Sequence, residues 1–224
     1  ILMNKCDYAD EAATRAWKQY YEKKGIRVLT CDCRSGKGLN AFLPEVKRLL
    51  AELIERRKKR GMIGKALRLM VVGIPNVGKS SFINRMAKTK KTKVGDKPGV
   101  TRGKQWVSID KDVELLDMPG ILWPKFDDQL AAQRLAFTGA IKDDVMDTEA
   151  LARALGAVLK EQYPDLLNAR YKLTGDEDIL RDIAKSRGML VSGGEPDTER
   201  AAAALLDEYR GGKIGRITLE KPCR

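Results

Sequence analysis

The apolar residues in the first half of the chain follow two spacings. Continuous or alternating apolar runs predict strands, and they lie over residues 1–3, 26–33, 66–73, 105–110 and 112–120. The third of these, ALRLMVVG, is apolar except for Arg68, which is typical of a strand buried on both faces of a parallel sheet. A tight polar turn joins the last two strands, QWVSID and DVELLDMPG.

Helical spacing separates these strands. It predicts helices over residues 11–24, 39–60 and 79–87, and the second is long, with apolar residues repeating from Leu43 to Ile54. Strands that alternate with helices in this way are typical of an α/β domain.

From residue 127 onward the pattern is almost wholly helical. Helices are predicted over residues 127–140, 148–162, 176–187 and 197–210. A strand-like run returns only at residues 215–220, GRITLE. We therefore predict an α/β domain over residues 1–130 and a small all-helical domain, with a role in RNA binding, over residues 131–224.

The charged residues indicate a basic protein surface. The 224 residues include 43 Lys and Arg against 31 Asp and Glu, a formal net charge of +12 that favours a polyanionic partner, although a merely soluble basic protein would share it. Bases concentrate in residues 55–61 (ERRKKRG) and 88–104, which lack aromatic residues. Contact with the backbone of structured RNA fits these runs better than base stacking does.

Several classes of protein do not fit the sequence. No apolar run is long enough for a membrane helix, and residues 1–10 have no signal-peptide character. The four cysteines lack zinc-site spacing and the chain has no histidine, so reduced thiols and a cytoplasmic location are expected.

The strongest motif is GIPNVGKS at Gly73 to Ser80, which lies between a predicted strand and a predicted helix. G-x-x-x-x-G-K-[ST] in that context is typical of a phosphate-binding loop rather than a chance turn. Lys79 would reach the β- and γ-phosphates and the Ser80 hydroxyl would bind Mg²⁺. Phosphate contacts are predicted for Asn76, Val77, Gly78, Lys79, Ser80, Ser81 and Gly120.

A second motif, Asp117-Met118-Pro119-Gly120, ends a predicted strand. Asp117 would bind Mg²⁺ through water, and the Gly120 N–H would contact the γ-phosphate. Thr101 is the candidate switch threonine on Mg²⁺, preferred over Thr89 and Thr92 because it precedes a strand.

The residue after that motif is apolar. Ile121 stands where a glutamine often orients the attacking water, and an apolar side chain cannot do this. The catalytic group is therefore left unassigned, with Thr101 and Lys79 assisting.

The chain begins with a base-reading motif, Asn4-Lys5-Cys6-Asp7, or N-K-x-D. Asp7 would accept hydrogen bonds from guanine N1–H and its exocyclic amine, a pair that adenine cannot supply. Lys5 would pack along the base, and Asn4 would tie this segment to the phosphate loop. Asp32 and Cys33 lie where a main-chain N–H would meet the guanine oxygen.

The order of these motifs is unusual because base recognition precedes the phosphate loop. The motifs NKCD, GIPNVGKSSFINR, KVGDKPGVTRGKQW and LLDMPGILWPKF, continued by LAFTGAIKD and VSGG, resemble the circularly permuted GTPases of the YlqF/YawG type over nearly the whole chain. The resemblance implies a P-loop GTPase fold with a permuted motif order, followed by a helical domain that contacts ribosomal RNA.

The resemblance also implies a function. It implies a monomeric cytoplasmic enzyme that binds GTP or GDP with Mg²⁺ and acts late in assembly of the large ribosomal subunit, with Asn76 a candidate ligand of K⁺. Members share the apolar residue at position 121, and a histidine preceding N-K-x-D is their candidate catalytic group. Family members carry that histidine in a segment before N-K-x-D. This chain has neither the segment nor any histidine, and no initiator Met precedes Ile1, so we expect it to be a fragment of a longer protein.

The resulting hypothesis is a GTP-hydrolysing switch, slow alone and stimulated by the ribosomal subunit, with no DNA or membrane partner. One alternative is a P-loop ATPase or kinase, against which N-K-x-D speaks. The other is a non-hydrolysing, nucleotide-dependent RNA-binding module, which Ile121 favours.

Overall fold

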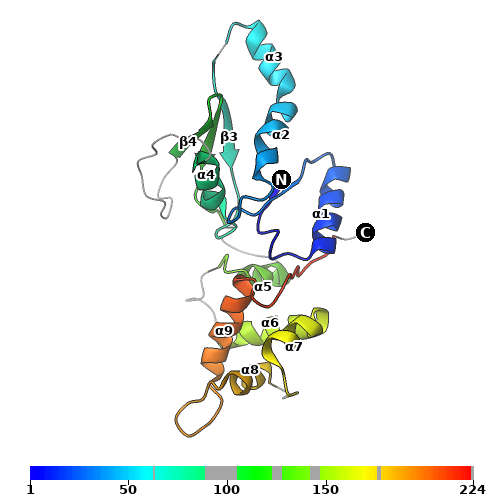
Figure 1. Cartoon of the computed structure of the whole chain (residues 1–224), viewed down its shortest axis with the longest axis vertical. Coiled ribbons are helices and arrows are strands. Elements are labelled where there is room, and N and C mark those ends of the chain that lie inside the picture. The colour runs from blue at the N-terminus through cyan, green and yellow to red at the C-terminus, as the bar shows by residue number, and fades with distance from the viewer. Residues whose placement is uncertain (63, 89–104, 123–127, 142–146, 176–177, 223–224) are drawn as a thin grey trace. The chain divides into compact units, whose positions relative to one another are not determined.

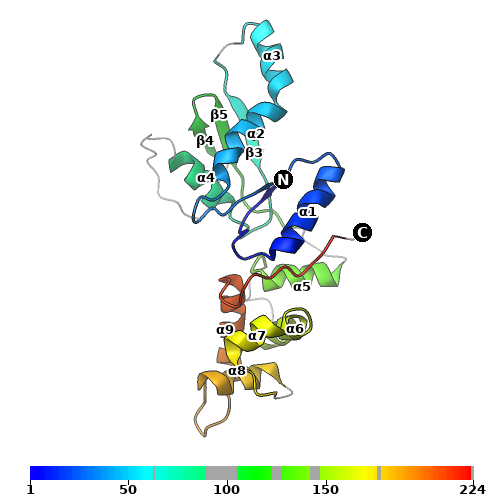
Figure 2. The same cartoon turned by 45° about the vertical axis from the view of Figure 1, so that its right-hand side comes forward.

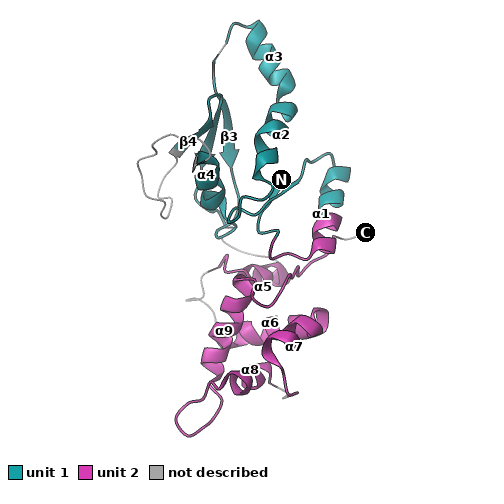
Figure 3. Ribbon diagram, in the orientation of Figure 1, with its two compact units in different colours: residues 1–6, 17–122 teal, residues 7–16, 123–224 magenta. Residues whose placement is uncertain are grey.

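The computed structural model divides the chain into two compact units, which Figure 3 colours separately. The described residues are 1–62, 64–88, 105–122, 128–141, 147–175 and 178–222. The first unit comprises residues 1–6 and 17–122, and the second comprises residues 7–16 and 123–224. Helix α1, Glu11–Lys23, therefore begins in the second unit and ends in the first.

The first unit contains two small sheets. In the larger one, β5 (Val113–Asp117) lies between β3 (Leu67–Val71), to which it is parallel, and β4 (Gln105–Asp110), to which it is antiparallel. The smaller sheet pairs β1 (Leu2–Met3) with β2 (Leu29–Thr30) in parallel. The predicted strands therefore exist, although the run over residues 26–33 forms only the two residues of β2.

Helix α4, Lys79–Lys88, covers one face of the larger sheet, and it lies beside the strands in Figures 1 and 2. Its Phe82 and Ile83 are buried together with Val113 and Leu115 of β5. Alternate residues of β3 point away from this core, and Met70 is 61% exposed. The prediction that β3 is buried on both faces is therefore wrong for the described residues.

The predicted helix over residues 39–60 is not continuous. A 3-10 turn (Leu39–Ala41) leads into α2 (Phe42–Leu49), and α3 (Ala51–Lys59) follows after a break at Leu50, where ψ is 14°. The break lets apolar residues on both sides of it, including Leu43 and Leu53, pack on one core.

The described residues of the second unit form helices around a core of their own. They are α5 (Gln129–Phe137), α6 (Thr148–Gln162), α7 (Pro164–Tyr171), α8 (Ile179–Arg187) and α9 (Thr198–Arg210). Helix α7 is not among the predicted elements. None of the helices among the described residues is long and apolar enough to cross a membrane.

The strand predicted over residues 215–220 is absent from the described structure, where this segment is irregular. Its Ile217 packs into the helical core instead, as does the neighbouring Ile214. Apolar side chains two or three residues apart can anchor an irregular segment as well as a strand. The apolar spacing of residues 215–220 therefore predicted a strand that does not form.

Aspartates cap four of these helices. Asp128, Asp147, Asp178 and Asp197 each accept hydrogen bonds from N–H groups in the first turn of α5, α6, α8 and α9 respectively. Such caps satisfy N–H groups that the helix itself leaves unpaired, which stabilises each helix start by about 1 kcal/mol.

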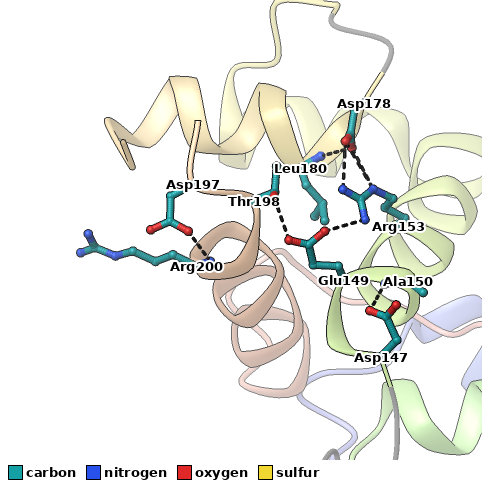
Figure 4. Close-up of polar contacts among 9 residues, drawn as sticks. All are labelled: Asp147, Glu149, Ala150, Arg153, Asp178, Leu180, Asp197, Thr198 and Arg200. Carbon is teal, nitrogen blue, oxygen red and sulfur yellow. Dashed lines mark hydrogen bonds and ion pairs between the residues drawn. The ribbon is translucent and has the colours of Figure 1, made fainter. Parts of the chain in front are cut away.

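The starts of three helices are also joined to one another, as Figure 4 shows. Arg153 of α6 pairs with the Asp178 cap of α8 at 3.1 Å and with Glu149 of its own helix at 2.8 Å. The other Glu149 oxygen accepts the Thr198 hydroxyl of α9 at 2.7 Å. One polar network therefore fixes α6, α8 and α9 at one end of the bundle.

A second network lies around Glu208 of α9. Its carboxylate accepts hydrogen bonds from Arg170 at 2.6 and 2.8 Å and from the Tyr171 hydroxyl at 2.8 Å, and Arg187 lies 3.3 Å away. The Arg170 guanidinium is the main cause that lowers the pKa of Glu208 to about 2.

We expect Glu208→Gln to lower the free energy of unfolding at pH 7 by about 1–3 kcal/mol, because its donors lose a charged acceptor. The ordinary glutamate pKa is near 4.5, so the stabilisation is complete above that pH and is lost as pH falls through about 2. Urea unfolding at pH 7 and pH 3 should show a smaller difference between wild type and variant at pH 3. Glu161→Gln, on an exposed position of α6, is the control, and an equal effect of both variants would contradict the assignment.

Candidate nucleotide-binding site

The phosphate loop lies between the end of β3 and the start of α4, as the sequence predicts. Its turn requires left-handed backbone at Asn76 (φ 59°) and Gly78 (φ 96°). A Cβ at Gly78 would collide with the side-chain amide of Asn4, so glycine is needed there for space as well as for conformation. Helix α4 begins at Lys79, which points the N–H groups of its first turn toward the loop.

The Lys79 side chain folds back over this loop. Its ammonium donates to the carbonyl oxygens of Gly73 at 3.0 Å and Ile74 at 2.7 Å. Burial lowers the pKa of Lys79, and the Asp117 carboxylate opposes that shift. A partly desolvated cation beside the N–H groups of a helix start is suited to binding an anion.

The Asp117–Gly120 motif meets the loop from the neighbouring strand. Asp117 ends β5 beside Val71 of β3 and is 8% exposed. A Cβ at Gly120 would lie 2.8 Å from backbone atoms of Pro75 and 3.0 Å from the Lys79 ammonium. The second predicted motif therefore lies directly against the first.

The residue after this motif also contacts the loop. The Ile121 N–H donates to the Gly73 carbonyl at 3.3 Å, while its side chain is 59% exposed. The main chain of Ile121 thus holds the two motifs together, and its side chain contributes no polar atom.

The donors near the loop fit Mg²⁺. The Asp117 carboxylate and the hydroxyl of Ser80, in the first turn of α4, are the hard oxygen ligands that this ion prefers. Ser81 lies exposed in the same turn. Thr101, the predicted switch threonine, lies outside the described residues.

Asn4 joins three segments of the first unit. Its amide nitrogen donates to the Val77 carbonyl at 2.9 Å, which confirms the predicted tie to the phosphate loop. Its amide oxygen accepts the Cys33 N–H at 3.1 Å and the Cys31 thiol at 3.7 Å. The next residue, Lys5, is exposed and has left-handed backbone (φ 58°).

The turn after β2 is held by Asp32, which is 6% exposed. Its carboxylate accepts the N–H groups of Arg34 at 2.7 Å and Ser35 at 3.0 Å, and hydrogen bonding from Ser35 is the main cause that lowers its pKa. The Cys33 N–H, predicted to meet guanine, donates to Asn4 in this structure.

Arg85 of α4 is a contact that sequence reasoning missed. Its guanidinium donates to the Ser35 carbonyl at 2.7 Å and lies against Gly36. No local signal marks an arginine whose partner is 50 residues away along the chain.

The cysteines of this turn are free thiols. The Sγ atoms of Cys31 and Cys33 lie 4.0 Å apart, and burial raises the pKa of Cys31 to about 12. Neutral buried thiols of this kind are poor nucleophiles and poor metal ligands.

Asp7 belongs to the second unit, whose boundary falls between Cys6 and Asp7. Its Oδ1 is buried and accepts no hydrogen bond from the described residues. A buried carboxylate oxygen normally has a donor, so this atom is suited to a ligand that brings one.

Comparisons with known proteins agree with these motifs. A family model described as 50S ribosome-binding GTPase matches residues 68–168. The chain is 45% identical to ribosome biogenesis GTPase A of Bacillus licheniformis and 33% identical to that of Thermotoga maritima. The alignments cover 99% of this chain and 80% and 76% of those proteins respectively.

The chain is also similar to solved structures of YlqF. The GDP-bound structure of TM YlqF matches 99% of this chain and 82% of its own chain, at 28% identity and a TM-score of 0.67. GNP-bound YlqF from T. maritima matches with a TM-score of 0.62 at 28% identity, over 99% of this chain and 80% of its own.

The role of Asn4 gives a direct prediction. Asn4→Asp keeps an acceptor for the Cys33 N–H but sets a carboxylate against the Val77 carbonyl, so only the tie to the phosphate loop should break. We expect GDP affinity, measured by titration of a fluorescent analogue, to fall about tenfold or more.

Asn168→Ala, on an exposed position of α7, is the control for this variant. Unchanged affinity in Asn4→Asp, with wild-type melting, would show that the tie does not shape the nucleotide site.

Proposed function

The chain belongs to the family of ribosome biogenesis GTPase A, and from that premise we propose a GTP-driven switch that acts late in assembly of the large (50S) ribosomal subunit. One observation carries the proposal: the Lys79 ammonium and Gly120 both lie against the phosphate loop. Together they would surround a bound phosphate. In this proposal the base-reading motif precedes the phosphate loop because the GTPase fold is circularly permuted.

In the proposed nucleotide site each candidate residue has a separate role. The loop N–H groups and Lys79 would bind the β- and γ-phosphates, and Gly120, already against Pro75, would contact the γ-phosphate. Mg²⁺ would supply charge neutralisation, held by Ser80 and Asp117 with Thr101. Asn76 is the candidate K⁺ ligand by family analogy.

Guanine would be read by the first motif. Asp7 would accept its N1–H and exocyclic amine, and the buried, unused Oδ1 supports this assignment. Lys5 would pack along the base, while Asn4, Asp32 and Cys33 would shape the turn after β2.

The exposed, apolar Ile121 supports slow hydrolysis by this chain alone, because it cannot orient water. We infer that another group, or one supplied by the ribosomal subunit, completes the site. The same observation favours the second candidate function, a nucleotide-dependent RNA-binding module that does not hydrolyse GTP.

Ribosomal RNA is the proposed partner. The last turn of α3 carries Arg56, Arg57, Lys58 and Lys59, and Arg60 follows. Arg56, Lys59 and Arg60 are exposed, so their charges are available to phosphates. A cytoplasmic monomer is the form that the family analogy favours.

Guanine reading can be tested by exchanging hydrogen-bond partners. In Asp7→Asn an amide donor replaces one carboxylate oxygen, and it can pair with the 2-carbonyl of xanthine. We expect GDP affinity to fall about 100-fold and XDP affinity to rise, measured by competition against a fluorescent nucleotide. Asp165→Asn, on exposed α7, is the control, and equal GDP binding by Asp7→Asn and wild type would refute the assignment.

Hydrolysis separates the two candidate functions. Phosphate release should rise at least about tenfold when large ribosomal subunits are added, and more in potassium than in sodium. Lys79→Ala should abolish this stimulated activity, whereas Lys111→Ala, at an exposed position beside β5, should retain it. Tight GTP binding without turnover in any of these conditions would favour the RNA-binding module.

A further inference from the structure

The segment after α9 does more than end the helical core. Residues 212–219, which we call the C-terminal strap, lie along residues 7–11, the segment that begins with the guanine-reading Asp7. Both segments belong to the second unit, although about 200 residues separate them along the chain.

The strap contacts this segment through main chain and side chain. The Ile217 N–H donates to the Tyr8 carbonyl at 2.8 Å, and the Thr218 hydroxyl oxygen accepts the Asp10 N–H at 3.0 Å. The Tyr8 ring lies against Gly212, where a Cβ would be only 2.5 Å from it.

Arg216 connects the strap directly to Asp7. Its Nε donates to the Asp7 carbonyl oxygen at 3.3 Å, and its guanidinium lies 3.7 Å from Glu11. The main chain of Asp7 is therefore held on one side by this arginine, while its Oδ1 stays buried and unused among the described residues.

The strap is itself fixed to the helical bundle. The Tyr163 hydroxyl donates to the Thr218 carbonyl at 3.0 Å and accepts the Thr218 N–H at 3.1 Å. Ile214 and Ile217 are buried in the helical core, and Gly215 lies against Leu166 of α7. A segment anchored at so many points can hold a neighbouring loop in one conformation.

We propose that the C-terminal strap positions Asp7 for guanine, so that Gly212, Arg216 and Thr218 are positioning residues for base discrimination. This inference rests on the proposed guanine reading by Asp7. Hydrogen bonds between strap side chains and the main chain of Asp7 and Asp10, on either side of Tyr8, fix the direction in which the Asp7 carboxylate leaves the backbone. If the strap were displaced, the Asp7 carboxylate would still be present but would point in a different direction. Selectivity for guanine would then fall more than the affinity for the phosphates.

The readout is the ratio of GDP to IDP affinity, because IDP lacks the exocyclic amine that only Asp7 is proposed to read. Gly212→Ala would push the Tyr8 ring away, and we expect it to reduce this ratio at least about fivefold. Gly188→Ala is the matched control: Gly188 also follows a helix with positive φ (63° against 68°), but a Cβ there meets nothing within 4 Å. Its ratio should equal that of wild type.

Two further variants cover the case in which Gly212→Ala fails to fold. Arg216→Ala removes the contact to Asp7, and Lys213→Ala, which removes a different basic side chain from the same strap, is its control. Thr218→Val removes the acceptor for the Asp10 N–H while keeping the shape of the side chain. Arg216→Ala and Thr218→Val should each lower the GDP to IDP ratio with melting temperatures close to wild type.

The outcomes distinguish guanine reading by Asp7 from the positioning of Asp7 by the strap. If Asp7→Ala leaves the ratio unchanged, the proposed guanine reading fails. If Asp7→Ala collapses the ratio but folded Gly212→Ala, Arg216→Ala and Thr218→Val all keep it, the strap inference alone is overturned. A ratio lowered in the strap variants and kept in Gly188→Ala and Lys213→Ala supports it.

Discussion

The first unit depends on the side chain of Asn4. One amide group satisfies the Val77 carbonyl and the Cys33 N–H, so it joins the phosphate loop to the turn after β2. Its approach also explains why Gly78 must be glycine. The amide of Asn4 is half-buried and pairs with main chain on two sides. Losing one of these bonds would leave a polar group unpaired, so the amide is a strict geometric constraint.

The second unit depends on charge placed at helix starts. Aspartate caps define where the helices begin, and Arg153 links one cap to Glu149 and, through it, to Thr198 (Figure 4). Because Arg153 satisfies two carboxylates at once, ordering its side chain stabilises two contacts rather than one. The bundle is thus specified by polar geometry as well as by its apolar core.

The sequence predicted the parts of the site whose signals are local. The strands beside Gly73 and Asp117 and the helix from Lys79 are where their motifs place them, because a phosphate loop and its partner strand impose short-range patterns. The break at Leu50 could not be predicted, since helical spacing continues across it and only packing decides where it bends.

Elements and contacts that no motif or clear repeat marks could not be predicted either. Arg85 and Ser35 carry no pattern that relates them, and α7 is too short to show a clear repeat. The role of Thr101 remains a prediction, as do the ligand-binding roles of the other candidate site residues, because no contact described in the structure tests them.

The boundary between Cys6 and Asp7 has a consequence for recombination among relatives. A chimaera that exchanged only residues 123–224 would pair a foreign strap with the native segment 7–16, and its hydrogen bonds to Tyr8 and Asp10 would meet an unmatched surface. Exchanging residues 7–16 together with 123–224 keeps those contacts intact. The unit that would have to be exchanged is therefore discontinuous, and its shorter piece, residues 7–16, begins at the last residue of the base-reading motif.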